Sequence, residues 1–408
     1  MRIKGFQAYR PPPDRAARIA SPPYDVVDTA EARRQAEGNP DCFFHVSRAE
    51  IDLPDGTDPH DDLVYRTAAA NFAAFRDRGT LFADSTPGLY LYRLTWGSHT
   101  QTGVFAVCHV DDYQHNVIRK HEKTRQAPED DRTRHLVALG AHTGPVLLAY
   151  RDQPAIDRLV EEESCQEPLY DLTAPDGIRH TVWKARDTAA LERLFAAVPV
   201  VYIADGHHRA AAAARVARER RTATKAGTGE EEFNWFLAVL FPAGRLKILP
   251  YNRCVRDLNG LTAEAFLRAV GERFEVTPAA HPAPEHSGRV HLFLKDRWVR
   301  LSWPSAAMED PVASLDVSVL QDRLLGPVLG IDDPRKNPRI EFVGGIHGTK
   351  ELEARVRSGR AAAAFSLYPT TVEQLMAVSD RGLTMPPKST WFEPKLRDGL
   401  LIHPLESF

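Results

Sequence analysis

The sequence predicts an α/β fold with mixed sheets, with α+β as the close variant. Short apolar runs rich in β-branched residues, such as 200–204, alternate with segments whose apolar residues recur at helical spacing, such as 61–80. Proline and glycine separate these segments, and 277–288 is the clearest linker-like break. We expect three parts: an N-terminal α/β segment at 1–100 that contributes to the site, a central domain at 101–275, and a C-terminal α/β unit at 289–408.

The first hundred residues begin with an irregular, proline-rich lead-in. Because proline cannot donate to a strand ladder, Pro-Pro-Tyr-Asp at 22–25 forms either a simple turn or a segment that places Tyr24 and Asp25 beside a ligand. Residues 43–48 predict an apolar strand that ends in polar groups. Residues 61–80 predict an amphipathic helix whose apolar stripe faces the core.

The rest of the chain alternates strands and helices. In the central part we expect a hairpin of strands 89–95 and 101–110, strands 146–150 and 180–183, helices 155–163 and 189–197, and a strand pair 234–241 and 246–249. In the C-terminal part we expect a helix from Thr262, strands 290–294, 298–303, 340–343 and 361–367, and helices 314–329, 351–358 and 371–380.

Composition argues for a globular protein of the cytosol. Hydrophobic residues make up 43% of the chain and charged residues 26%, and a formal net charge of -3 gives no bulk attraction to nucleic acid. The four cysteines lie far apart, which argues against a zinc cluster and a disulfide framework. The sequence contains no apolar run of membrane-spanning length and no signal-peptide pattern. We expect a cytoplasmic protein without a membrane partner, and a homo-oligomer stays open.

One stretch carries most of the functional expectation. The apolar run 200–204 predicts a buried strand, Asp205-Gly206 a tight turn, and the alanine-rich 210–214 a helix. At the first residues of a helix the backbone N–H groups are unpaired and the helix dipole favours an anion. The turn therefore predicts a phosphate cradle formed with the residues that follow it, His207, His208 and Arg209.

Other interpretations of this turn stay open. The two histidines and the arginine fit an ordinary packed and paired arrangement as well. A zinc site is disfavoured, because adjacent histidines point in different directions. The chain also contains no Gly-x-Ser-x-Gly elbow, no Walker loop and no Gly-x-Gly-x-x-Gly fingerprint. Any nucleotide therefore binds through neither common phosphate loop.

Two further segments concentrate polar side chains. Residues 118–132 form either a solvated charged helix or a metal-phosphate site, and the residues that suggest the latter are His121, Glu122, Thr124, Glu129, Asp130 and Arg132. The proline-flanked stretch 385–395 predicts a shaped loop, since proline excludes a helix interior or a central strand. Its candidate phosphate or carboxylate contacts are Lys388, Ser389 and Thr390.

Several motifs along the chain, taken together, resemble those of one protein family. They are Pro22-Pro23-Tyr24-Asp25-Val26-Val27, Arg119-x-His121-Glu122-x-Thr124 with Glu129-Asp130-x-Arg132, Ala204-Asp205-Gly206-His207-His208-Arg209, Tyr251-Asn252-Arg253, Leu315-Asp316-Val317, and Met385 to Pro394 with Gly399-Leu400-Leu401-Ile402. Over nearly its whole length the chain therefore resembles the bacterial and archaeal family known as domain of unknown function 1015. The family name implies kinship and no activity.

The turn itself is similar to the phosphate-binding motif of the ParB/sulfiredoxin superfamily, in particular its free-serine kinases. This resemblance implies a ParB-like central domain in which His207, His208 and Arg209 contact nucleotide phosphates. It also implies that Asp205 acts as a base or a magnesium ligand. This chain is far longer than those kinases and shows no match for their N-terminal catalytic glutamate, so its substitute would be one of Glu122, Glu129 and Asp130.

Together these inferences define a predicted site. Catalytic roles fall to Asp205, His208, Glu122 and Glu129, and a metal-ligand role to Asp130. Nucleotide contacts are expected from Gly206, His207, Arg209, His121, Thr124, Arg132, Lys388, Ser389 and Thr390.

Phosphoryl transfer needs cations on the phosphates and carboxylates for the metal and the nucleophile, and this inventory supplies both. We expect a phosphotransferase that uses ATP or ADP and Mg²⁺ to phosphorylate a small hydroxylated metabolite such as free serine. Two alternatives stay open. One is a non-catalytic nucleotide- or metabolite-gated binding protein, and the other is a metal-dependent hydrolase or lyase with His121, Glu122, His207 and His208 around a metal.

Overall fold

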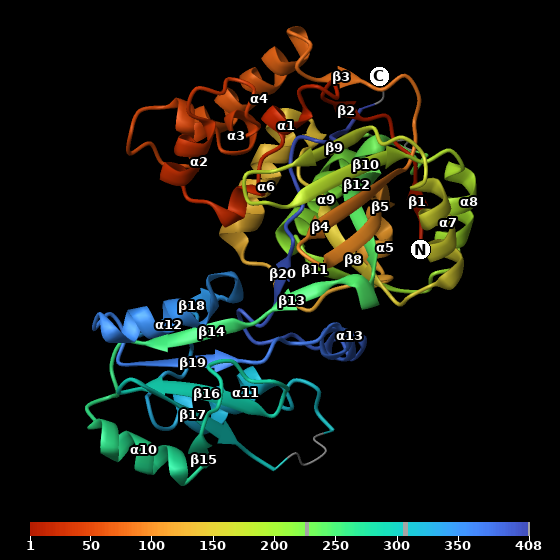
Figure 1. The fold of residues 1–408 in the computed structure, drawn as a ribbon. Helices are drawn as coiled ribbons and strands as arrows, with labels where there is room; N and C mark the ends of the chain where they lie inside the picture. Colours follow the sequence, from red (N-terminus) through yellow and green to blue (C-terminus); the bar gives the residue numbers. More distant parts are fainter. Residues whose placement is uncertain (225–227, 305–308, 407–408) are drawn as a thin grey trace. The chain divides into compact units, whose positions relative to one another are not determined.

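The structure, a computed structural model, describes residues 1–224, 228–304 and 309–406. The chain forms two compact units, one comprising 1–246 with 394–408 and the other 247–393. Each unit combines helices with a sheet, which confirms the predicted mixed α/β class (Figure 1). The expected boundaries near residue 100 and at 275–289 fall inside these units, because strand pairing continues across both places.

The first unit is built on a nine-stranded mixed sheet in the order β6-β11-β8-β12-β5-β4-β10-β9, with β1 paired to β5. The pairs β11–β6 and β12–β8 are parallel, and the other neighbours are antiparallel. The strands are β1 (Ile3–Lys4), β4 (Tyr90–Trp96), β5 (His99–His109), β6 (Ile118–Arg119), β8 (Val146–Tyr150), β9 (Tyr170–Thr173), β10 (Arg179–Lys184), β11 (Val201–Asp205) and β12 (Trp235–Pro242). Two short ribbons, β2 (Tyr9–Arg10) with β3 (Phe82–Ala83) and β7 (Ala141–His142) with β21 (His403–Pro404), complete the strands.

The helices of the first unit pack on this sheet or on one another. They are α1 (Ala16–Ile19), α2 (Thr29–Ala36), α3 (Phe44–Ser47), α4 (Asp62–Asp77), α5 (Val110–Gln114), α6 (Gln126–Leu139), α7 (Pro154–Glu163), α8 (Thr188–Ala196) and α9 (His207–Ala223). Helix α9 packs on β8, β12 and α6, while α7 packs on α8 and β5 (Figure 1). The central strands β8 and β12 are buried along their whole length, as near-continuous apolar runs predict for strands covered on both faces.

The segment 43–48 corrects one sequence prediction. It forms the short helix α3 instead of a strand. Phe43 and Val46 pack into one apolar cluster and Phe44 into another, so the helix is buried on two sides. A short element that is apolar on two sides shows no helical stripe, and its apolar run cannot be distinguished from a buried strand by periodicity.

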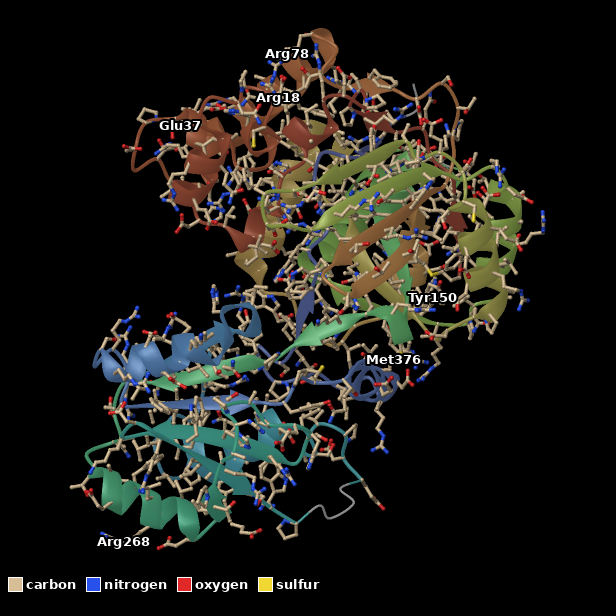
Figure 2. The ribbon with its side chains drawn as sticks, viewed as in Figure 1. Arg18, Glu37, Arg78, Tyr150, Arg268 and Met376 are labelled. Atoms are coloured by element: carbon tan, nitrogen blue, oxygen red, sulfur yellow. The ribbon has the colours of Figure 1, made fainter. Side chains whose placement is uncertain are left out.

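The second unit carries a six-stranded sheet in the order β15-β17-β16-β19-β14-β18 and a two-stranded ribbon of β13 with β20. Its strands are β13 (Lys247–Leu249), β14 (Tyr251–Val255), β15 (Glu275–Pro278), β16 (Arg289–Leu294), β17 (Arg297–Ser302), β18 (Ile340–Gly344), β19 (Ala363–Leu367) and β20 (Trp391–Glu393). Its helices are α10 (Ala263–Gly271), α11 (Asp316–Leu320), α12 (Gly348–Arg357) and α13 (Val372–Asp380). Met376 of α13 is buried, whereas Arg268 of α10 is exposed (Figure 2).

Three expectations for this part need correction. Strand β13 pairs with β20 and not with the preceding strand β12, because a 3₁₀ turn at Ala243–Arg245 separates the two. The helix expected at 314–329 is α-helical only to Leu320 and continues as a π-helical turn, Gln321–Leu325. The loop expected at 385–395 contains the short strand β20. Among the described helices, none is long and apolar enough to cross a membrane.

Candidate functional site

The predicted strand, turn and helix form as β11, Gly206 and α9. Gly206 adopts the left-handed conformation with φ of +96°, where a side chain would be strained. A Cβ atom there would also lie 3.2 Å from Nε of Arg209 and 3.4 Å from Cα of Val146. In the described structure, the side chains provide no N-terminal cap for α9. The first N–H groups of a helix have no intrahelical partner, and in α9 no side-chain cap from the described residues satisfies them. This is the geometry that binds anions.

Asp205 ends β11 beside this helix start. Its Oδ2 atom forms an ion pair with Nζ of Lys395 at 3.1 Å. Burial alone would raise the pKa of Asp205, but the positive charges of Lys395 and Arg209 outweigh it and hold the pKa below its ordinary value. Asp205 therefore stays ionised at neutral pH.

The two histidines tie the segment 121–125 to the start of α9. Nε2 of His207 accepts a long hydrogen bond of 3.5 Å from the backbone N–H of His121, and the two rings lie nearly perpendicular with centroids 4.4 Å apart. Nε2 of His208 accepts a hydrogen bond of 3.1 Å from the backbone N–H of Arg125. The structure thus brings the polar segment 118–132 and the Asp205–Arg209 turn together.

Burial fixes the charge state of these histidines. Burial lowers the pKa of His121 to about 4. Burial, with a smaller contribution from neighbouring His121, holds the pKa of His207 well below its ordinary value, and burial also lowers the pKa of His208. All three side chains are neutral at pH 7. The positive charge at this turn therefore comes from arginine and lysine.

Arg209 lies in the first turn of α9 with only 11% of its side chain exposed. It donates from Nη1 to the backbone carbonyl of Pro145, and its Nη2 atom lies 4.0 Å from Oδ2 of Asp25. No partner among the described residues accepts a hydrogen bond from its buried Nε atom. Burial opposes the charge of Arg209, but Asp25 and Asp205 hold its pKa above the ordinary value.

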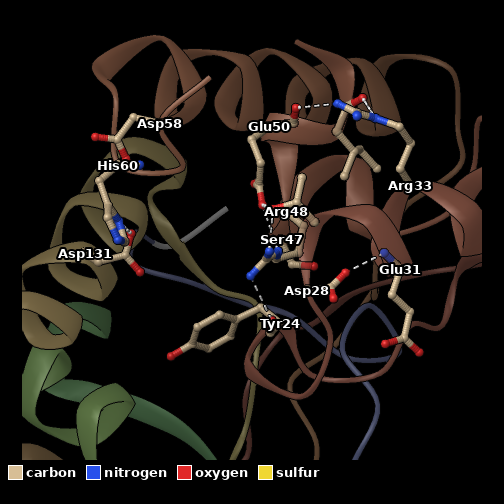
Figure 3. A network of polar contacts seen from close by, with 12 residues as sticks. Tyr24, Asp28, Glu31, Arg33, Ser47, Arg48, Glu50, Asp58, His60 and Asp131 are labelled. Carbon is tan, nitrogen blue, oxygen red and sulfur yellow. Dashed lines mark hydrogen bonds and ion pairs between the residues drawn. The ribbon is translucent and has the colours of Figure 1, made fainter. Parts of the chain in front are cut away.

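Arg132 approaches the same place from α6. Its guanidinium carbon lies 3.6 Å from the centroid of the Tyr24 ring, and its Nε and Nη2 atoms contact Oδ2 of Asp131 at 2.7 and 2.6 Å. The Tyr24 segment is held in turn by Arg48, which donates to the Tyr24 carbonyl at 3.3 Å and pairs with Glu50 at 2.8 Å (Figure 3). Tyr24 and Asp25 therefore lie beside Arg132 and Arg209, and a ligand contact for this segment stays a prediction.

Arg132 and Arg209 both line a pocket in the first unit. The pocket holds about 420 Å³ of empty space, its solvent-open mouth included. Asp398 also lines it and is only 2% exposed. Burial raises the pKa of Asp398 to about 7, although Arg209 and Arg132 oppose the shift. Within the described residues its Oδ1 atom has no hydrogen-bond partner.

The other predicted site residues are placed as follows. Oγ1 of Thr124 donates to Oε2 of Glu129 at 2.8 Å, so these two side chains fix the start of α6 to the preceding loop. Asp130 pairs with Arg215 of α9. Glu122 is exposed.

The loop residues Lys388, Ser389 and Thr390 belong to the second unit. There Arg253 donates to the carbonyl of Lys388 at 3.0 Å, and the hydroxyl of Ser389 donates to the carbonyl of Pro386 at 2.7 Å. Their role at the Asp205–Arg209 turn stays a prediction. The residues that the structure describes contain no group of three or more His, Cys, Asp or Glu side chains arranged to hold a metal ion.

Sequence reasoning missed Lys395 and Asp398. Both lie in the C-terminal segment that returns to the first unit. Asp398-Gly399 repeats the Asp-Gly pair of the turn, and Gly399 also has a positive φ, +85°. The same pair occurs at 55–56 and 176–177, so this signal alone does not single out Asp398. For Lys395 we find no comparable signal.

Comparison with solved structures finds several proteins of low similarity to this chain. A conserved hypothetical protein from Pyrococcus furiosus is 17% identical, with 73% of this chain and 94% of that chain covered and a TM-score of 0.36. A free serine kinase variant in complex with ADP is 16% identical, covering 73% and 92%, with a TM-score of 0.35. SbnI with a C-terminal truncation from Staphylococcus aureus is 11% identical, covering 74% and 87%, with a TM-score of 0.40. At these identities and TM-scores the likeness carries no functional argument.

No curated protein matches the chain. A family model does, and it matches residues 3–318, which include the Tyr24 segment, the 118–132 segment and the Asp205–Arg209 turn. Its description is "Protein of unknown function (DUF1015)", and the chain belongs to this family.

Proposed function

We propose that the protein is a nucleotide-dependent phosphotransferase that acts on a small hydroxylated metabolite, with free serine as the first acceptor to test. The observation that carries the proposal is the start of α9. There an uncapped helix N-terminus follows a left-handed glycine, with the ionised Asp205 before it and the buried Arg209 in its first turn. Phosphate oxygens suit such a start because backbone N–H groups, the helix dipole and a guanidinium converge on them.

The charges at this place suit phosphoryl transfer, in which catalysis is mainly positioning and charge stabilisation. Arg209 supplies a permanent cation. Asp205, whose pKa lies below its ordinary value, is a weak base at neutral pH and a better electrostatic or metal-binding group than a proton acceptor.

The start of α9 is open to a nucleotide, whereas for Mg²⁺ it offers a single carboxylate, that of Asp205. Any Cβ at Gly206 would crowd Arg209, so the glycine keeps the approach to the helix start open. Magnesium at nucleotide sites takes one or two carboxylates together with phosphate and water oxygens, and Asp205 supplies one such carboxylate. Its ion pair with Lys395 would then have to open.

The test is product formation. Purified protein is incubated with Mg²⁺, L-serine and either ATP or ADP, and phosphoserine is measured. Arg209→Ala is expected to reduce turnover by about 100-fold or more, because it removes the cation aimed at the transferred group. Arg209→Lys keeps the charge but loses the planar fork, so an intermediate rate is expected. Arg218→Ala is the matched control, since Arg218 lies on the exposed side of the same helix.

Turnover that is unchanged in Arg209→Ala would contradict the site assignment. Calorimetric titration with ATP, ADP and CTP separates catalysis from mere binding. Tight nucleotide binding without any product would favour the nucleotide-gated binding protein over the phosphotransferase. Circular dichroism of each variant shows whether a lost activity reflects the side chain or a lost fold.

A further inference from the structure

The pocket beside Arg209 is lined by side chains of both charges. Its walls include the guanidinium groups of Arg132 and Arg209, the carboxyl group of Asp398, and the small residues Gly144 and Ala212. Arg209 belongs to both the helix start and the pocket, so a molecule in the pocket would lie beside the proposed phosphate cradle.

One wall of the pocket is cationic. Nε of Arg209 is buried, and within 1–224, 228–304 and 309–406 nothing accepts its hydrogen bond. Arg132 is oriented by Asp131 on one side and by the Tyr24 ring below it. Guanidinium groups held in fixed planes favour planar anions such as carboxylates, which they can bind through two parallel hydrogen bonds.

The pocket lining also contains a hydrogen-bond acceptor, the carboxyl group of Asp398. The backbone of Asp398 is fixed by a pair of hydrogen bonds with Ser21, of 3.0 and 3.2 Å. Its side chain is almost fully buried, and its Oδ1 atom is without a partner in the described part of the chain. A buried carboxylate oxygen that lacks a donor carries a free-energy cost that a ligand or water donor removes.

The approach to this oxygen is narrow. A Cβ atom at Gly144 would lie 3.0 Å from Oδ1 of Asp398, and Gly144 itself has no positive φ that would require glycine. The absence of a side chain at Gly144 therefore keeps space open in front of the carboxyl group. The pocket, with about 420 Å³ of empty space including its solvent-open mouth, has room for a ligand of a few heavy atoms.

We infer that this pocket binds a small carboxylic acid bearing an adjacent ammonium or hydroxyl group, with its carboxylate at Arg209 and Arg132 and the adjacent group donating to Asp398. The inference rests on the proposed function only in naming this ligand the acceptor of the phosphoryl group. Binding itself is a property of the pocket and requires no nucleotide.

The titration of Asp398 should make the affinity of the pocket for its ligand depend on pH. The groups that act on it are Arg209 of α9, Arg132 of α6, Asp25 of the N-terminal segment and its chain neighbour Arg397, and buried His135 and His142 also line the pocket. Because the pKa of Asp398 is raised to about 7, its ionised form grows across neutral pH. A ligand that donates to the ionised form, an ammonium group above all, binds more tightly as pH rises through this range.

The test is calorimetry with the full chain and no nucleotide. L-serine carries an α-ammonium and a β-hydroxyl group, L-alanine only the α-ammonium group, L-lactate an α-hydroxyl group in its place, and propionate neither donor. Propionate is expected to bind about tenfold or more weakly than L-serine, because a hydrogen bond to a charged group is lost. L-alanine and L-lactate then identify which donor Asp398 prefers. Affinity for L-serine is expected to be higher at about pH 8 than at about pH 6.

Two variants test the geometry independently. Asp398→Asn should weaken L-serine binding by about tenfold and abolish its pH dependence, because the amide does not ionise. Gly144→Ala should weaken binding without changing any charge, since its methyl group occupies the approach to Oδ1. Asp171→Asn is the control, because it removes a carboxylate that pairs with Arg179 outside the pocket.

The outcomes are separable from those of the turnover assay. Equal affinity for propionate and L-serine, unchanged affinity in both pocket variants, or no binding of any of the four acids would overturn the inference. Phosphoserine formation with wild-type serine affinity in Asp398→Asn would leave the phosphotransferase standing and reject the pocket. Serine binding that depends on Asp398, without any phosphoserine product, would do the opposite.

Discussion

Asp205 and Asp398 form a natural pair for comparison. Each precedes a glycine with a positive φ, +96° at Gly206 and +85° at Gly399, and each lies within the electrostatic influence of Arg209. Yet their pKa values shift in opposite directions. The pKa of Asp205 lies below its ordinary value, whereas that of Asp398 is raised to about 7.

The difference comes from direct pairing. For both groups burial is the largest influence and raises the pKa. Asp205 has an ion pair with Lys395 at 3.1 Å in addition to Arg209. Arg209 and Arg132 favour the charged form of Asp398, but among the described residues no donor contacts its Oδ1 atom. The negative charge of nearby Asp25 raises the pKa of Asp398 further. One local motif thus provides a permanent anion at one place and a group that titrates at neutral pH at the other.

The largest effect is expected from removing the charge that both aspartates share. Arg209→Met should lower the free energy of unfolding by about 3–5 kcal/mol, because it removes a buried cation that acts on both carboxyl groups. The pKa of both carboxyl groups should rise. Urea unfolding of the full chain as a function of pH measures both effects, with Arg218→Met as the control. A stability loss that is the same at every pH would show that Arg209 acts only through packing.

The next largest effect should be a gain in stability. Asp398→Asn is expected to stabilise the protein above neutral pH by up to about 4 kcal/mol, the free-energy equivalent of a shift from an ordinary aspartate pKa of about 3.9 to about 7. The sign follows from linkage. A raised folded-state pKa means that the native protein binds this proton more tightly, so wild-type stability rises as pH falls from about 7 to about 4.

The variant has no such group, and its advantage should therefore shrink across that interval. Urea midpoints at several pH values check this expectation. An advantage that does not change with pH would contradict the raised pKa.

The strand, turn and helix at 200–214 could be predicted from sequence because their signals are local. A β-branched run, an Asp-Gly pair and an alanine-rich helix lie within one short stretch, and β11, Gly206 and α9 form there. The same locality explains the correct hairpin of β4 and β5 and the helix α4.

The partners of the cradle are not local, and periodicity carries no information about them. Nothing in the sequence says that His207 accepts from the backbone of His121, or that Lys395 returns to Asp205. The neutral state of His207 was equally hidden, because it results from burial that only the tertiary structure creates. Asp130 pairs with Arg215, a contact between two helices that pattern reasoning cannot place, and its role as a metal ligand stays a prediction.

The next largest effects should come from replacing the glycines that follow the two aspartates, Gly399 and Gly206. Gly399→Ala should cost about 2–4 kcal/mol, because strain at positive φ adds to overpacking against buried Phe43, whose ring atoms would lie 2.7–2.9 Å from the new Cβ. Gly206→Ala should cost about 1–2 kcal/mol, since its Cβ meets Arg209 and Val146 only at 3.2–3.4 Å. Thermal unfolding gives both values. If the cradle is the nucleotide site, only Gly206→Ala should also weaken ATP binding in calorimetry.

The smallest effect should separate the two aspartates most cleanly. Lys395→Met removes the partner of Asp205 and should cost about 1 kcal/mol at neutral pH, because the pair is partly exposed to solvent. The depressed pKa of Asp205 contributes stability that is present above its unfolded-state pKa and is lost as pH falls through its folded-state pKa. The difference between wild type and variant should therefore vanish in acid. The stability change near pH 7 belongs to Asp398 and should persist in Lys395→Met. If that change also disappears, the two carboxyl groups titrate as one coupled system, and the separate roles assigned to them would have to be merged.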